Sequence, residues 1–332
     1  MNTFSRILYK ILFIVMCVVT CLVLFVFELY KETTDPVQQF ETNNPSIVTD
    51  GVTQVSAHRS GAGIFPENTL IAFQGCIESE EFNTDIFEFD LHITKDGVLI
   101  LSHDSTLDRM TNAETVFGYS GVRISDLTYD EIRTLNFGEG FRNANGVYPY
   151  AGLHGEFIPE NLRALSLENA LDYLESNGGF KYIIEIKNGG DLGYKAADEL
   201  YRILSERNLL SKVVVGTFNG EVTKYMDENY PGLIRSASIA EAVFFFLRAT
   251  FNVPAKESTF DFDALQVPPM AVVLNLASTR VINYAHEHNL AMQFWTVNDP
   301  YEVKRIAENG GDAIMSDYPD MAYSVIHDTT GE

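Results

Sequence analysis

Residues 181–217, KYIIEIKNGGDLGYKAADELYRILSERNLLSKVVVGT, contain the pattern that decides the fold. The stretch opens with an apolar segment at 181–186, continues through a helical pattern at 193–207 and closes with a second apolar segment at 212–217. Apolar strands of this kind are buried on both faces, which is typical of parallel strands joined by a helix. The stretch therefore predicts a β-α-β unit of an α/β protein.

The same alternation continues on both sides of this unit. Because it extends over roughly 250 residues, the length of one barrel, it predicts a single TIM (β/α)8 barrel and not two domains. Nine candidate strands compete for eight positions, so one of them is wrong or lies outside the barrel. The candidate strands are 53–58, 86–93, 98–103, 181–186, 212–217, 233–238, 263–267, 292–297 and 313–316, and the candidate helices include 69–80, 126–135, 166–176, 193–207, 220–228, 278–288 and 299–309.

Composition excludes several classes of protein. Of the 332 residues, 46% are apolar and 21% are charged, which is typical of a globular chain. Lys and Arg number 23 against 46 Asp and Glu, so the net charge of −23 opposes binding to nucleic acid. A small anionic substrate remains compatible if its site carries cations. No dinucleotide, Walker, zinc-ribbon or serine-hydrolase motif occurs, three Cys are too few for a disulfide framework, and no protein partner is implied.

An apolar run near the amino terminus predicts a membrane anchor. Ile11–Phe27 carries no charge, and Ile7–Tyr30 extends it to a length that spans a bilayer as a helix. Arg6 and Lys10 precede the run, which places the amino terminus in the cytoplasm and the rest of the chain outside the membrane. A cleaved signal peptide is the alternative, but its apolar core is shorter and ends in small residues. We therefore expect an uncleaved anchor.

The predicted organisation has three parts. Residues 1–31 form a cytoplasmic stub and transmembrane anchor, residues 32–50 a polar tether, and residues 51–332 the barrel. The long connection at 137–165 has a length often found in functional lids. The run at 242–251, AVFFFLRATF, has two interpretations: an outer helix of the barrel, or an exposed apolar lip that contacts lipid.

Polar residues gather at the carboxyl ends of the candidate strands, where the active site of a parallel barrel lies. Glu88 and Asp90 are two apart and so share one face of a strand. With Glu185 on another strand they offer oxygen ligands suited to Mg²⁺ or Ca²⁺, although salt bridges to Arg59 and Lys187 are the alternative. The residues at these strand ends are His58, Arg59, Glu88, Asp90, His103, Asp104, Glu185, Lys187 and Trp295.

An Asp-Gly pair at 96–97 predicts a hairpin with a two-residue turn. Counting outward from Lys95 opposite Val98 sets His103 opposite Asp90, and directly paired residues share a face. His103 is therefore expected beside the carboxylates. His92 falls on the same face.

Five ordered blocks of the sequence contain these polar residues and the turns around them. The blocks are Ala57–Gly61 with Pro66–Thr69 and Ala72-Phe73, Glu88–Asp90 with Thr94–Gly97, Ser102–Asp104 with Leu107–Arg109 and Thr111, Glu185–Lys187, and Trp295–Asn298 with Gly311–Pro319. Together they resemble the glycerophosphodiester phosphodiesterase family. They depart from the family pattern in the first block, where Ser60 follows His58-Arg59 in place of the usual glycine.

The resemblance implies a TIM-barrel enzyme that hydrolyses glycerophosphodiesters to glycerol 3-phosphate and an alcohol. By analogy, the 2-hydroxyl of the substrate attacks phosphorus, and water then opens the cyclic phosphate. Glu67 is expected to be structural. The implied roles are a divalent metal, Ca²⁺ or Mg²⁺, on Glu88, Asp90 and Glu185, general acid and base for His58 and His103, phosphate binding for Arg59 and Lys187, and substrate contact for Trp295.

Two other hypotheses remain open from the sequence. The first is a phosphodiesterase that acts on intact phospholipid or on a glycerophosphate wall polymer, in keeping with the anchor and with the apolar run at 242–251. The second is a membrane-tethered module that binds its ligand without turnover.

Overall fold

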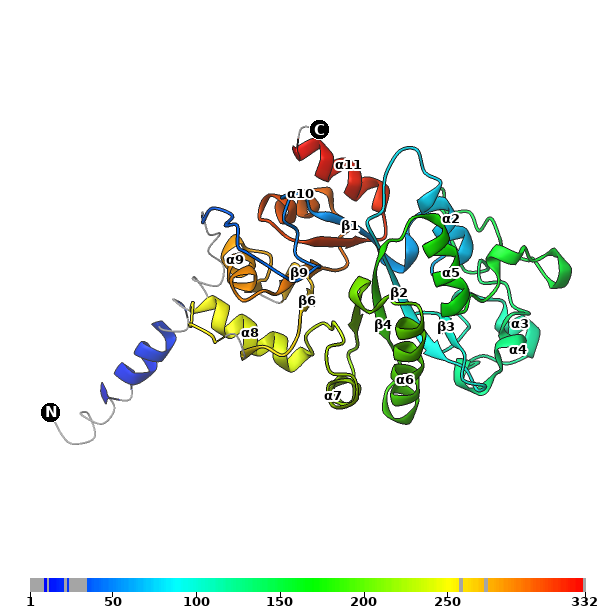
Figure 1. Ribbon diagram of the computed structural model, residues 1–332, viewed down its shortest axis with the longest axis horizontal. Helices are drawn as coiled ribbons and strands as arrows, with labels where there is room; N and C mark the ends of the chain where they lie inside the picture. The colour runs from blue at the N-terminus through cyan, green and yellow to red at the C-terminus, as the bar shows by residue number, and fades with distance from the viewer. Residues whose placement is uncertain are drawn as a thin grey trace.

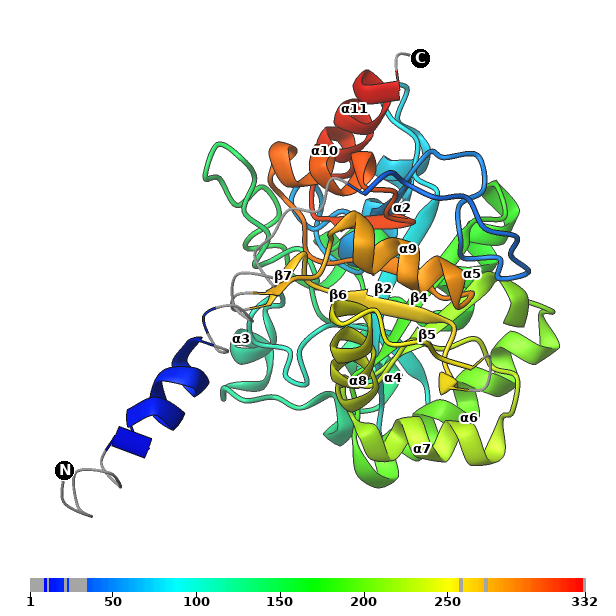
Figure 2. The same ribbon diagram turned by 90° about the vertical axis from the view of Figure 1, so that its left-hand side faces the viewer.

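The structure is a computed structural model that describes residues 9–10, 12–20, 23, 35–256, 259–271 and 274–330. The predicted anchor therefore lies partly outside the described residues. Its described residues 12–20 are helical and project away from the body of the molecule (Figures 1 and 2). Within the described part of the chain, no helix combines the length and the apolar character needed to span a bilayer.

Parallel strands form a nearly closed ring, in the order β5-β4-β2-β1-β10-β9-β6. Single parallel bridges join Val215 to Arg235 and Ser236 to Ala264, so the short segment 235–236 connects the two edges of this sheet. The predicted TIM-type barrel is thus confirmed. The strands are β1 (Gln54–Ala57), β2 (Ile86–Ile93), β3 (Leu99–Leu101), β4 (Lys181–Ile186), β5 (Val213–Gly216), β6 (Ala264–Val267), β7 (Met270–Ala271), β8 (Leu274–Asn275), β9 (Ala291–Phe294) and β10 (Ala313–Ser316).

Helices lie outside the strands (Figures 1 and 2). Their apolar faces meet the outward-facing strand residues; Phe87 and Phe89, for example, pack edge-on against Phe73 of α2. The described helices of the body are α2 (Leu70–Ile77), α3 (Ala113–Phe117), α4 (Tyr129–Ile132), α5 (Leu167–Asn177), α6 (Gly190–Glu206), α7 (Gly220–Asn229), α8 (Ile239–Thr250), α9 (Thr279–Glu287), α10 (Pro300–Glu308) and α11 (Pro319–Thr330).

The surplus candidate strand is the one predicted at 98–103, which corresponds to β3. It lies outside the ring and pairs with β2 in antiparallel fashion. The predicted register of this hairpin is wrong by one residue. Thr94 donates its N–H to the carbonyl of Val98 at 2.9 Å, and Gly97 has a φ of +85°, so the turn has three residues. A glycine in the left-handed region is what a three-residue turn needs. Ser102, and not His103, therefore lies opposite Asp90.

From Asp35 onward the predicted tether lies against the barrel. Asn44 donates from Nδ2 to the carbonyls of Asp263 and Asn289 at 2.8 and 2.9 Å. Ile47 is buried with Ile183 and other residues from the amino ends of the strands. The segment therefore closes the end of the barrel opposite the carboxyl ends of the strands.

Candidate active site

One cavity of about 700 Å³ opens at the carboxyl ends of the strands. It contains every residue to which the family resemblance gives a role, although these come from five separate strands or the residues that follow them. No residue of the predicted lid at 137–165 is among the described residues that line it. The predicted residues in its lining are His58, Arg59, Glu88, Asp90, His103, Glu185, Lys187 and Trp295.

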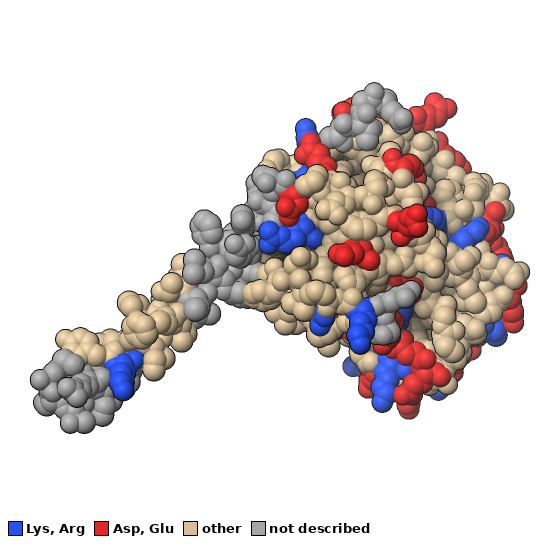
Figure 3. Space-filling model, turned by 60° about the vertical axis from the view of Figure 1, so that its left-hand side comes forward, with Lys and Arg blue, Asp and Glu red and all other residues tan. Residues whose placement is uncertain are grey.

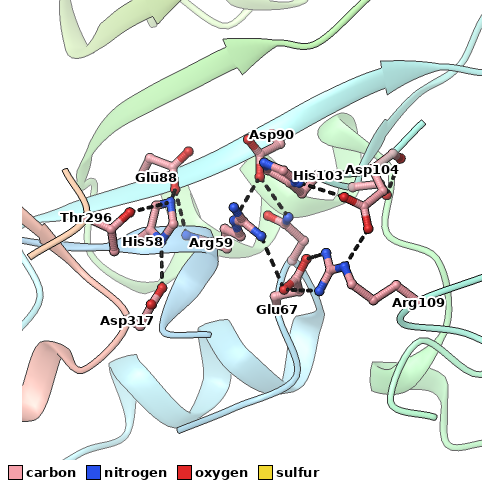
Figure 4. A network of polar contacts seen from close by, with 12 residues as sticks. His58, Arg59, Glu67, Glu88, Asp90, His103, Asp104, Arg109, Thr296 and Asp317 are labelled. Carbon is pink, nitrogen blue, oxygen red and sulfur yellow. Dashed lines mark hydrogen bonds and ion pairs between the residues drawn. The ribbon is translucent and has the colours of Figure 1, made fainter. Parts of the chain in front are cut away.

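His58 follows β1 directly, where the chain turns into one turn of 3-10 helix and Arg59 takes a left-handed φ of +47°. The His58 Nδ1 atom lies 2.6 Å from Oδ1 of Asp317, and its Nε2 atom lies 3.9 Å from Oε2 of Glu88 (Figure 4). Burial lowers the pKa of His58, but the negative charges of Glu88 and Asp317 outweigh it and raise the pKa above its ordinary value. Asn298 fixes Asp317 with a 2.6 Å hydrogen bond from Nδ2.

Glu88 and Asp90 point from the same face of β2 into the cavity, and both are buried. Glu88 accepts a 2.6 Å hydrogen bond from the N–H of Arg59. Burial and the neighbouring charge of Asp90 raise the pKa of Glu88 to about 8. The sequence predicted this shared face from the two-residue spacing.

Asp90 and Glu185 are paired in the register of β2 and β4, so their side chains lie next to each other. The ammonium of Lys187 lies between them, 3.2 Å from Oδ1 of Asp90 and 3.0 Å from Oε1 of Glu185. Burial acts to raise the pKa of Asp90, but Lys187 and Arg59 outweigh it and lower that pKa. For Glu185, burial outweighs Lys187 and the pKa is raised.

His103 lies just beyond β3 and is held by a chain of polar contacts. Its Nδ1 atom lies 2.8 Å from Oδ1 of Asp104, and Oδ2 of Asp104 accepts a 2.5 Å hydrogen bond from Nε of Arg109 (Figure 4). Arg109 also makes two hydrogen bonds to Glu67, which agrees with the structural role predicted for that residue. His92 is buried and donates from Nε2 to the carbonyl of His103 at 3.2 Å, so it helps to fix the backbone at His103.

The expected metal ligands share the cavity without forming a ready-made metal centre. Among the described residues, no group of three or more His, Cys, Asp or Glu side chains is arranged to hold a metal ion. The salt bridges that the sequence left as the alternative are present, because Lys187 lies on Asp90 and Glu185 and Arg59 Nε lies 3.7 Å from Asp90.

The sequence-based assignment missed two residues of the site. Asp317 follows β10 directly, and Phe218 follows β5 by two residues. Phe218 lines the cavity, with its ring centroid 5.7 Å from that of Trp295 in an edge-on arrangement and 6.0 Å from Nζ of Lys187. The signal that found the other residues, a position at the carboxyl end of a strand, was present for both.

An α/β barrel whose cavity combines two imidazoles, three carboxylates and two cations holds the groups that hydrolysis of an anionic ester needs, because these groups can move protons and stabilise negative charge. The model of the glycerophosphoryl diester phosphodiesterase family matches residues 58–321. The chain therefore belongs to this family, and it is a phosphoric diester hydrolase. The non-enzymatic binding module is set aside.

Individual relatives are similar to this chain over most of its length, and the solved structures among them share its fold. A glycerophosphodiester phosphodiesterase of Bacillus subtilis is 27% identical over 274 residues, which cover 81% of this chain and 85% of the relative. The solved glycerophosphodiester phosphodiesterase of Agrobacterium tumefaciens has a TM-score of 0.59 at 20% identity, covering 82% and 99% of the two chains. An Oleispira antarctica phosphodiesterase solved with its product sn-glycerol-3-phosphate has a TM-score of 0.59 at 19% identity, covering 83% and 98%.

Proposed function

We propose that this chain is a membrane-anchored, metal-dependent glycerophosphodiester phosphodiesterase that releases glycerol 3-phosphate and an alcohol outside the cytoplasm. The observation that carries the proposal is the pair of imidazoles in one cavity. His58 and His103 each have Nδ1 beside a carboxylate, of Asp317 and of Asp104 respectively. The Nε2 atom of each ring could then transfer a proton to and from a substrate. In His58 this atom lies 3.5 Å from Oγ1 of Thr296 and 3.9 Å from Oε2 of Glu88.

The reaction follows from the substrate's own hydroxyl group. One imidazole takes the proton of the substrate's 2-hydroxyl group. The hydroxyl oxygen bonds to phosphorus, and the bond from phosphorus to the oxygen of the leaving alcohol breaks. The other imidazole gives its proton to the departing alcohol. In the second half the roles reverse, and water opens the cyclic phosphate to glycerol 3-phosphate. Arg59 and Lys187 hold the phosphate oxygens, on which negative charge gathers.

The donor set fits a hard divalent cation. Glu88, Asp90 and Glu185 supply carboxylate oxygens, which are the ligands of Ca²⁺ and Mg²⁺. Burial and the neighbouring charge of Asp90 raise the pKa of Glu88, so a cation beside these carboxylates would favour their charged forms. These three residues would hold the ion, with Lys187 moving from Asp90 and Glu185 toward the phosphate. When bound, the ion adds positive charge beside the phosphate.

The anchoring part of the proposal depends on the amino-terminal run. Ile11–Phe27 is long enough to span a bilayer, and Arg6 and Lys10 flank its amino end. In the described part of the run, Leu12, Phe13 and neighbouring apolar side chains are exposed, as expected for a helix whose partner is lipid. The barrel would then lie on the extracytoplasmic side of the cell membrane.

Hydrolysis of glycerophosphocholine by the purified full-length protein tests the catalytic part. With Ca²⁺ or Mg²⁺ supplied, His58→Ala and His103→Ala should each lower kcat by about 10²–10⁴-fold, the range for general acid–base catalysis. His154→Ala is the matched control, because His154 is exposed and does not line the cavity. Chelation of the metal should abolish turnover and its return should restore it. Unchanged kcat in both cavity variants would refute the acid–base roles of the two imidazoles. Full activity in the presence of chelator would refute the metal dependence.

A further inference from the structure

The cavity has two chemically different halves. Its charged lining residues all come from β1 to β4 or the residues just after them, in the half described above. On the other side α8, β6 and the residues after β6 line it with uncharged, mainly apolar side chains, among the residues that the structure describes. We call this half the apolar wing. Its members include Ile239, Val243, Phe246 and Leu247 of α8, with Val267 and Leu276.

Helix α8 builds the wing because it has two apolar faces. Phe245 and Ala249 pack into the core, as in any outer helix of a barrel. Ile239, Val243 and Leu247 are four residues apart and so form one stripe on another face. Their exposed fractions are 61%, 56% and 52%, and all three line the cavity. The predicted outer helix is thus confirmed, and its second apolar face borders the site.

The chemistry of the wing selects its ligand. A contiguous exposed apolar surface is unfavourable in water and marks a binding site. No charged side chain among the described lining residues lies in the wing, so a charged alcohol or a glycerophosphate polymer finds no ionic partner there. A hydrocarbon chain needs no such partner and gains from leaving water.

We propose that the apolar wing binds a hydrocarbon chain of a glycerophosphodiester whose phosphate occupies the polar half; the inference rests on the proposed function. The chain can be carried by the glycerol, as in a lysophospholipid, or by the alcohol, as in a glycerophospho-N-acylethanolamine. Both leave the 2-hydroxyl free for attack on phosphorus, whereas a diacyl phospholipid does not.

The experiment measures kcat/KM of the full-length protein in lipid nanodiscs. Substrates are 1-acyl lysophosphatidylcholines with chains from six to twelve carbons, and the rate on glycerophosphocholine is the reference for each protein. We expect kcat/KM to rise by up to about fourfold per methylene group (about 0.8 kcal/mol) until the chain outgrows the wing. A parallel series of glycerophospho-N-acylethanolamines shows which side of the phosphate carries the chain: the series with the steeper rise identifies it.

Two variants separate the wing from simple enrichment of the substrate in the nanodisc. Val243→Asn/Leu247→Asn should flatten the rise, because it places amide groups on the stripe. Val116→Asn makes the same change at a site on α3 that is 46% exposed and does not line the cavity, and it should keep the wild-type slope. Equal slopes in the wild type and the Val243→Asn/Leu247→Asn variant overturn the inference.

The failure of the inference is distinguishable from that of the proposed function. If the wild type hydrolyses glycerophosphocholine but neither series shows a rise, the wing binds no chain and the proposed function still holds. If no diester is hydrolysed, glycerophosphocholine included, the proposed function fails and the inference fails with it.

Discussion

At the scale of single residues, Asp317 shows how one side chain prepares another for chemistry. Its carboxylate lies 2.6 Å from Nδ1 of His58 and is itself fixed by Asn298. A carboxylate on Nδ1 keeps the proton there and leaves Nε2 as the reactive atom. We therefore assign Asp317 as a positioning residue for His58.

This assignment predicts that Asp317→Asn lowers kcat on glycerophosphocholine. The loss should be at most that expected for removing His58 itself, about 10²–10⁴-fold. Because Asp317 acts through His58, the same substitution in a His58→Ala background should cause little further loss. The measurement is a double-mutant cycle on kcat, with KM followed separately. An equal loss in both backgrounds would show that Asp317 supports the fold and not the imidazole.

The residues of the site were largely predictable, because position at a strand end converts directly into a place in the barrel. That rule located His58, Glu88, Asp90 and Glu185 in one cavity. It left open whether Lys187 forms ion pairs with Asp90 and Glu185, since these depend on the path of a flexible side chain. Asp317 also stands at a strand end, but its contact with His58 depends on β10 lying beside β1, which the strand-end position does not show.

At the scale of elements, the segment 235–236 closes the ring and connects it to α8. Arg235 is buried and donates hydrogen bonds to both Asp227 of α7 and Glu241 in the first turn of α8. Glu241 also accepts hydrogen bonds from the N–H and hydroxyl of Ser238, which caps that helix. One buried guanidinium thus ties the closing segment to the helix that forms the apolar wing.

Glu241→Gln should lower the free energy of unfolding at pH 7 by about 1.5–3 kcal/mol, the usual value of hydrogen bonds to charged groups. Burial raises the pKa of Glu241, but the hydrogen bonds from Arg235 and Ser238 outweigh it, so the folded pKa is lowered. The stabilisation is therefore present above the unfolded pKa of about 4.3 and is lost as pH falls through the folded pKa.

Thermal unfolding at pH 7 and at pH 4 checks this expectation. The difference between the wild type and Glu241→Gln should shrink at the lower pH. Glu228→Gln is the matched control, because Glu228 forms an exposed pair with Lys224 and should change stability by less than about 1 kcal/mol. A pH-independent difference for Glu241→Gln would mean that its charge contributes nothing.

Elements were predictable where periodicity alone defines them and were mistaken where a single turn or docking contact decides. Strand and helix positions followed from the alternation of apolar runs. The β2–β3 register failed because a left-handed residue at Gly97 adds one residue to the turn. Residues 35–48 looked like a tether because their polar side chains bind backbone groups of the barrel, which composition does not distinguish from solvation.

At the scale of the whole molecule, the chain is strongly acidic, whereas the cavity combines cations with carboxylates. Acidic side chains are spread over the face of the body seen in Figure 3, in keeping with the net charge of −23. Arg59 and Lys187 place positive charge inside the cavity, where the surrounding protein screens it less than water would. Because three carboxylates share the cavity with these cations, the proposed divalent ion would be needed to make the site attractive to an anionic phosphodiester.

We expect two different roles for the amino-terminal residues: those up to residue 34 anchor the chain in the membrane, and those from Asp35 onward stabilise the barrel. Asp35 lies 3.6 Å from Arg280 of α9, and Asn283 of the same helix donates to the carbonyl of Pro36. Further along, Ile47 is buried at the end of the barrel, and the N–H of Val48 donates to Asp312 at 2.8 Å.

A chain that begins at Asp35 should therefore leave the membrane fraction and keep its hydrolysis of glycerophosphocholine, whereas one that begins at Gly51 should also unfold at a lower temperature. Loss of Ile47 alone removes about 1.5–3 kcal/mol of apolar burial. Cell fractionation and thermal unfolding of the two chains measure these effects. Equal stability of the two chains would show that residues 35–48 contribute nothing to the stability of the barrel.

The side of the membrane on which the barrel lies is tested separately, by adding protease to intact cells. The protease should digest the barrel of the full-length protein, and a barrel protected from protease would place it in the cytoplasm.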